Sequence, residues 1–75
     1  MMTARLTYDP SVNAAYIHLR AGKSARTEEI APGVMVDFAD DGMPLGIEFL
    51  NAESAFGGVP TGVEFRVLGG APAKV

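Results

Sequence analysis

The chain has 75 residues, enough for one domain (1–75) but too few for a large core, so we expect it to need disulfides, metals or oligomerisation for stability. It contains no cysteine and one histidine, which excludes disulfides and a cysteine nucleophile and disfavours a zinc site built from protein ligands alone. The net charge of −3, with six Lys and Arg residues spread thinly, argues against a nucleic-acid partner. Oligomerisation is the remaining source of support.

The same sequence predicts no membrane partner. Residues 1–5 run into a polar turn without the apolar centre of a signal peptide, and no apolar run approaches the roughly 20 residues of a membrane span. Because a cysteine-free chain suits a reducing compartment, we expect a cytoplasmic protein.

Residues 5–8 and 14–20 predict the first two strands, separated by a turn at Asp9–Asn13. The first strand has Leu6 and Tyr8 on one side. The second has an apolar side of Ala15, Ile17 and Leu19 and a polar side of Tyr16, His18 and Arg20. Such alternation is typical of a sheet with one buried and one solvated face.

The next segments read as a loop and an edge. Residues 21–25 are small and polar, and residues 26–30 alternate without an apolar set, which predicts an exposed edge strand or an extended arm. Pro32 and Gly33 end this segment, because proline cannot donate to a β-ladder.

The strongest pattern lies at residues 34–50, where two alternating apolar runs flank Asp41-Gly42, a dipeptide typical of two-residue hairpin turns. Counting outward from this turn gives three apolar pairs: Phe38–Leu45, Val36–Ile47 and Val34–Phe49. All six side chains share one face, because side chains alternate along a strand, and we expect them to be buried together.

Beyond Asn51 the pattern is weaker. Residues 53–56 predict one helical turn closed by Gly57-Gly58, residues 63–67 predict a last strand, and residues 69–75 predict a frayed tail. The fold class is therefore mainly β: a single antiparallel sheet, mostly a meander, of four to five strands with one short helical turn.

Several motifs in order resemble the DUF2283 family of small bacterial and archaeal proteins of unknown function. They are Tyr8-Asp9-Pro10, Ala15-Tyr16-Ile17, residues 32–38, Asp41-Gly42 and residues 45–50. Two features depart from the family pattern: Asn13 stands where an acidic residue is common, and the glycine-rich stretch after Phe56 has no counterpart. The resemblance implies no catalytic residues, and it implies an antitoxin or partner-binding role because such families often lie beside small toxin-like genes.

The polar side of the sheet holds the candidate chemical groups. His18 belongs to the residue type most used for acid–base chemistry and shares its strand face with Tyr16 and Arg20, which predicts an anion-binding row or an ordinary solvated face. In the register above, Asp37 lies opposite Gly46 and Met35 opposite Glu48, so Asp37 and Glu48 are diagonal neighbours. Such carboxylates serve glycosidases or bind cations, but we expect them to pair with Arg20 or Arg66.

Two functions follow from these patterns. The first is a non-enzymatic interaction or oligomerisation module, a homodimer with an antitoxin-like role toward a small protein partner. The alternative is a small ligand-binding or hydrolytic protein using His18, Asp37 and Glu48. We favour the first, because no set of nucleophile, base and orienting group can be assembled, and we predict no catalytic residue, cofactor or metal. The predicted interface residues are Phe38, Ile47, Phe49, Val63 and Phe65. Two sheets packed face to face would bury Phe38, Ile47 and Phe49, whereas edge pairing that extends the sheet would use residues 5–8 or 63–67.

Overall fold

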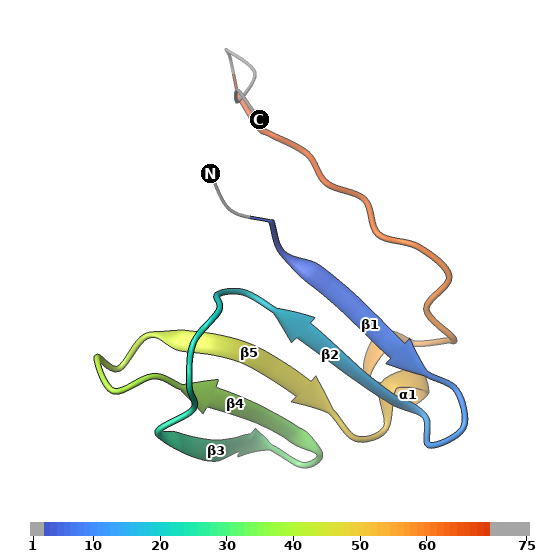
Figure 1. Cartoon of the computed structure of the whole chain (residues 1–75). Coiled ribbons are helices and arrows are strands. Elements are labelled where there is room, and N and C mark those ends of the chain that lie inside the picture. The colour runs from blue at the N-terminus through green and yellow to red at the C-terminus, as the bar shows by residue number, and fades with distance from the viewer. Residues whose placement is uncertain (1–2, 70–75) are drawn as a thin grey trace.

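Five strands and one short helix make up residues 3–69, the part of the chain that the computed structural model describes (Figure 1). The elements are β1 (Arg5–Asp9), β2 (Ala14–His18), β3 (Arg26–Ala31), β4 (Val34–Phe38), β5 (Pro44–Phe49) and α1 (Ala52–Phe56). The predicted frayed tail lies outside the described residues, apart from Gly69. No helix within residues 3–69 is long and apolar enough to cross a membrane.

The strands form a single antiparallel sheet in the order β1-β2-β5-β4-β3, which confirms the predicted fold class. Two hairpin-connected groups, β1–β2 and β3–β4–β5, follow the expected meander. However, β2 pairs with β5 rather than with β3, because residues 19–25 carry the chain across the sheet to its far edge (Figure 1). Strands β2 to β5 therefore have Greek-key order.

The central hairpin has the predicted register along most of its length. Val34 lies opposite Phe49 and Val36 opposite Ile47, and Asp37 lies opposite Gly46. The turn differs, because the loop has three residues rather than two: the Ala39 amide donates to the Met43 carbonyl (2.9 Å). Gly42 in this loop has φ of 84°, a left-handed conformation typical of three-residue hairpin loops.

A bulge compensates for the longer loop. Phe38 pairs with Pro44, and the register shifts between Asp37 and Phe38, so Leu45 is the extra residue of β5. The predicted Phe38–Leu45 pair is therefore wrong. Leu45 lines a groove together with Tyr16 and Asp37. The prediction had placed Leu45 on the face opposite to these two residues.

The cross-strand register defines two faces. The apolar face carries Leu6 and Tyr8 of β1, Ala15 and Ile17 of β2, Val34, Val36 and Phe38 of β4, and Ile47 and Phe49 of β5. The polar face carries Arg5, Thr7, Tyr16, His18, Thr27, Asp37, Gly46 and Glu48. Helix α1 lies on the apolar face, where Phe56 packs against Phe49 with ring centroids 4.8 Å apart (Figure 1).

The core of this single layer is small. The buried apolar residues within 3–69 are Ala15, Val36, Ala39, Leu45 and Ala52. Of the six hairpin residues predicted to be buried together, Val36 and Leu45 are buried, whereas the other four are half-buried. One helix of five residues covers only part of a five-stranded sheet, so within residues 3–69 most of the apolar face lacks a second layer.

The chain after the sheet is helical and then extended. The predicted turn at 53–56 is confirmed as α1, and Gly57 ends it in the left-handed conformation with φ of 73°. The amide of Gly58 donates to the Glu53 carbonyl (2.8 Å), as in a Schellman motif. The predicted strand at 63–67 is wrong: no ladder partner is found within residues 3–69, and the segment runs away from the sheet past β1 (Figure 1).

Candidate functional site

A hydrogen-bonded group centred on Asp37 organises the polar face. The Tyr16 hydroxyl donates to Oδ2 of Asp37 and the Thr27 hydroxyl donates to Oδ1, each at 2.5 Å. Thr27 lies directly opposite Asp37 on β3, but Tyr16 belongs to β2, on the far side of β5. The Asp37 carboxylate therefore connects three strands, and the Tyr16 ring bridges a fourth.

Gly46 allows the Tyr16 ring to reach Asp37. This residue of β5 lies between His18 of β2 and Asp37 of β4. A Cβ atom built on Gly46 would overlap the ring and the hydroxyl of Tyr16. The missing side chain is thus replaced by the phenol ring, which explains a buried glycine inside a strand.

The electrostatics of this group oppose proton transfer at neutral pH. Hydrogen bonds from Thr27 and then from Tyr16 lower the pKa of Asp37 below its usual value. Burial, together with the hydrogen bond to Asp37, raises the pKa of Tyr16 to about 12. Asp37 is consequently a weak base and Tyr16 a weak acid, whereas acid–base catalysis favours groups with a pKa near the working pH.

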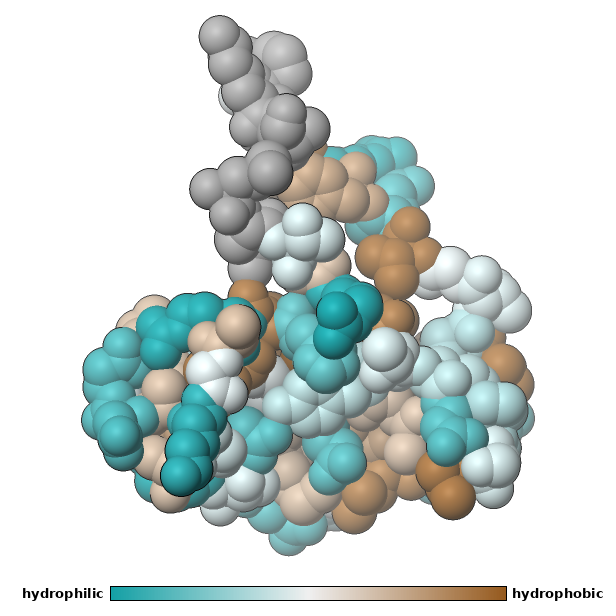
Figure 2. Space-filling view, viewed as in Figure 1, coloured by the Kyte–Doolittle hydropathy of each residue, from teal (hydrophilic) through white to brown (hydrophobic). Residues whose placement is uncertain are grey.

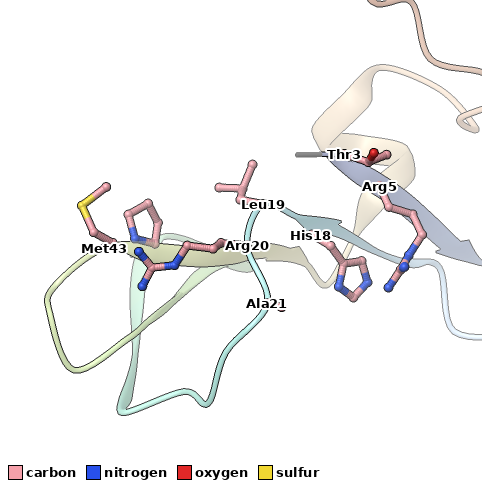
Figure 3. Close-up of a pocket in the computed structure, with 8 residues that line it drawn as sticks. Thr3, Arg5, His18, Leu19, Arg20, Ala21 and Met43 are labelled. Carbon is pink, nitrogen blue, oxygen red and sulfur yellow. The ribbon is translucent and has the colours of Figure 1, made fainter. Parts of the chain in front are cut away.

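His18 contacts this group through its ring. Its ring packs against Tyr16, with centroids 4.4 Å apart and planes inclined by 52°. It also lies opposite Arg5 of β1, and both line an open groove whose other walls include Leu19 and Pro44 (Figure 3).

Arg20 does not join the predicted row of polar side chains. Its guanidinium donates to both carboxylate oxygens of Asp41 in the hairpin loop, at 3.1 and 3.2 Å. This interaction lowers the pKa of Asp41. Figure 3 shows Arg20 directed toward Met43 and away from His18 and Arg5. The predicted anion-binding row is therefore reduced to the Tyr16–His18 pair.

Asp37 and Glu48 are placed as predicted, but Asp37 does not pair with an arginine. Met35 lies opposite Glu48 and Asp37 opposite Gly46, so the two carboxylates are diagonal neighbours on the polar face. Asp37 is bound by hydroxyl groups rather than by Arg20 or Arg66, and Arg66 pairs with Glu64 at 2.9 Å. Within residues 3–69 no group of three or more His, Cys, Asp or Glu side chains is arranged to hold a metal ion.

The predicted interface residues fall into two sets. Phe38, Ile47 and Phe49 lie half-buried on the apolar face, where the Arg26 guanidinium also lies 4.4 Å from the centroid of the Phe38 ring. Val63 and Phe65 lie on the extended segment beyond α1 and are 73% and 79% exposed. The space-filling view shows apolar residues interspersed with polar ones over the visible surface (Figure 2).

Asn13 has a structural role that sequence reasoning missed. It adopts a left-handed conformation, with φ of 53°. Its backbone carbonyl accepts from the Ala52 amide (2.9 Å), and its Oδ1 accepts from the Glu53 amide (3.1 Å). Its Nδ2 also donates to Oδ1 of Asn51 (2.8 Å). Asn13 thus caps the start of α1 in place of Asn51, whose side chain makes no capping bond.

Comparison with protein families assigns the chain. A family described as "Protein of unknown function (DUF2283)" matches residues 5–53, which is more than half of the sequence. The chain belongs to the DUF2283 family. The DUF2283 match includes all five strands, Asn13 and the group centred on Asp37. It ends at Glu53, within α1. No match is found among curated proteins or among solved structures.

Proposed function

We propose that this DUF2283 protein is a non-enzymatic interaction module that forms a homodimer through the apolar face of its sheet. The supporting observation is the half-burial of large apolar side chains on that face, among them Ile17, Val34, Ile47 and Phe49. They lie in adjacent pairs, Ile17 and Val36 beside Ile47, and Val34 beside Phe49. Contiguous apolar surface of this kind is uncommon on monomeric soluble proteins and marks interaction sites.

The size of the core supports the same proposal. No large side chain within residues 3–69 is fully buried, and the core consists mainly of alanines with Val36 and Leu45. A 75-residue chain already buries a smaller share of its surface than a larger domain does. A second copy packed on the apolar face, about 10 Å away as in stacked sheets, would supply the missing layer.

The hydrogen bonds of the polar face argue against a catalytic role for its residues. Both oxygens of Asp37 accept from hydroxyl groups, and Tyr16 keeps its proton to high pH. The hydrolytic alternative, which uses His18, Asp37 and Glu48, would require these satisfied contacts to be broken first.

Sedimentation equilibrium of the unmodified chain tests the proposal. We expect a mass of twice 7.9 kDa at micromolar concentration and a melting temperature that rises with protein concentration. Ile47→Asp on the apolar face should shift the protein toward monomer, whereas Met35→Asp, on the opposite side of the hairpin, should not. A cooperatively folded species of 7.9 kDa at all concentrations would contradict the homodimer and leave the face to a different small protein, as an antitoxin-like role requires.

A further inference from the structure

We propose that residues 63–67, here called the arm, pair as an added strand with the outer edge of β1 in a second copy, so that two copies exchange arms. This inference rests on the proposed homodimer and specifies which segment pairs with the free edge strand of each sheet. The arm lies outside the family match, so the exchange would be a property of this chain beyond the matched region.

The arm already has the conformation and the sidedness of a strand. Arg66 Nε and Glu64 Oε1 are 2.9 Å apart, a contact between side chains two residues apart that lie on the same side of an extended chain. The other side carries Val63, Phe65 and Val67, which are 73%, 79% and 47% exposed. Val63 lines an open groove with Leu6 and Ile17 of its own chain, whereas Phe65 and Val67 have no neighbouring strand within residues 3–69.

The two edges of the sheet differ in their capacity to accept a strand. β3 carries Arg26, Glu28 and Glu29, and its register shifts after Glu29, which are features that protect an edge from further pairing. β1 pairs with β2 without a shift over all five of its residues. Its outer side has no ladder partner within residues 3–69. β1 is therefore the edge that we assign to the arm.

Side-chain chemistry favours the parallel orientation. Setting Glu64 beside Arg5 in a parallel orientation places Phe65 beside Leu6 and Val67 beside Tyr8, so the apolar side of the arm continues the apolar face. Arg66 then lies beside Thr7 and diagonally near Asp9, with opposite charges adjacent. In the antiparallel orientation, the register that places Phe65 beside Leu6 sets Arg66 beside Arg5, and the register that places Phe65 beside Tyr8 sets Glu64 beside Asp9, so like charges lie directly opposite each other.

The parallel orientation also favours a second copy as the source of the arm. In Figure 1 the chain leaves α1 near the end of β1 and runs back toward the start of β1, which is the antiparallel direction. Pairing in parallel within one chain would require residues 57–62 to travel the full length of β1 first. A six-residue connection spans at most about 20 Å, and the return along β1 uses most of that length.

Cysteine cross-linking tests the exchange, because the natural chain has no cysteine. Thr7→Cys in one copy and Arg66→Cys in another, mixed and oxidised, should give a disulfide-linked pair of chains. Glu28→Cys on the opposite edge, mixed with Arg66→Cys, is the matched control and should give little product. A Thr7→Cys/Arg66→Cys double variant should form links between chains; a link within one chain would overturn the exchange.

Substitution in the arm provides an independent measurement. Phe65→Asp should raise the dimer dissociation constant by about tenfold or more, because it removes a large apolar side chain from the interface. Thr61→Asp, which adds the same charge at an exposed residue before the arm, should leave the constant unchanged. A dimer that is insensitive to Phe65→Asp and gives no Thr7–Arg66 product would refute arm exchange but leave the apolar-face dimer standing. A monomeric natural chain would refute both.

Discussion

The ring of Tyr16 occupies the space over Gly46 that a side chain would otherwise fill. This relationship lets a residue of β2 reach across β5 to the carboxylate of Asp37 on β4. The Tyr16–Asp37 hydrogen bond between β2 and β4 therefore requires that Gly46, on the intervening strand β5, has no Cβ atom. We therefore expect Gly46, Tyr16 and Asp37 to respond to substitution as one unit.

Gly46→Ala should destabilise the protein by roughly 1–3 kcal/mol, because the new Cβ atom forces the Tyr16 ring out of place and breaks its bond to Asp37. In a Tyr16→Ala background the same substitution should cost much less, since the overlap is gone. Thermal unfolding of the four proteins of this double-mutant cycle measures the coupling. Additive changes would mean that the ring does not occupy this space in solution.

Alkaline pH should expose the role of the Tyr16 hydroxyl. The folded-state pKa of Tyr16, about 12, is raised above the value of about 10 for an unfolded chain. A raised pKa gives stability that is complete below pH 10 and is lost as the pH rises through the folded value. The melting temperature of the natural protein should therefore fall more steeply from pH 10 to 12 than that of Tyr16→Phe. Parallel profiles would contradict this assignment.

Acid should act on the other member of the pair. The pKa of Asp37 is lowered in the folded protein, so its ionised carboxylate stabilises the fold at pH values above the unfolded-state pKa of about 3.9. This stabilisation is lost as the pH falls through the folded-state pKa. Asp37→Asn should remove this part of the acid dependence. Asp40→Asn, at an exposed residue of the hairpin loop, is the control. Chemical denaturation from pH 2 to 6 measures both.

The sequence predicted the register of the central hairpin away from its loop, because the apolar alternation and the position of Asp41-Gly42 agree there; it missed the third loop residue and the bulge at Leu45 that compensates for it. It did not predict that β2 lies beside β5, because that pairing joins residues about 30 positions apart without a turn that dictates it. The strand predicted at 63–67 shows the same limit. Alternation describes one segment, whereas a strand also requires a neighbour, and the described chain provides none.

The candidate site was predictable only in part, for a related reason. The register correctly placed Asp37 opposite Gly46, and alternation placed Tyr16 and His18 on one face. The Tyr16–Asp37 bond depends on a ring crossing an intervening glycine, and the capping role of Asn13 depends on contacts 38 and 40 residues away. Neither interaction leaves a periodic signal in the sequence.

Asn13 should be important both for its conformation and for its hydrogen bonds. Asn13→Ala places a less tolerant residue at a positive φ and removes the cap, so we expect a loss of about 1–2 kcal/mol. Asn13→Gly keeps the backbone conformation but not the side-chain hydrogen bonds to Asn51 and Glu53. It should therefore reduce the free energy of unfolding by less than Asn13→Ala does. Equal losses for the two variants would mean that conformation contributes little. Urea denaturation followed by circular dichroism provides the comparison.

Ile47→Ala connects the stability of the fold to the homodimer. Replacing a fully buried isoleucine by alanine costs about 2–5 kcal/mol, and half-burial in a single chain reduces this to roughly 1–2 kcal/mol. In a dimer packed through the apolar face Ile47 becomes fully buried, so the cost should approach the higher range as protein concentration rises. For a domain of this size 1 kcal/mol corresponds to about 4–8 °C in melting temperature. The difference between natural protein and variant should therefore widen by several degrees between low and high micromolar concentration. A constant difference would place Ile47 outside any interface between copies.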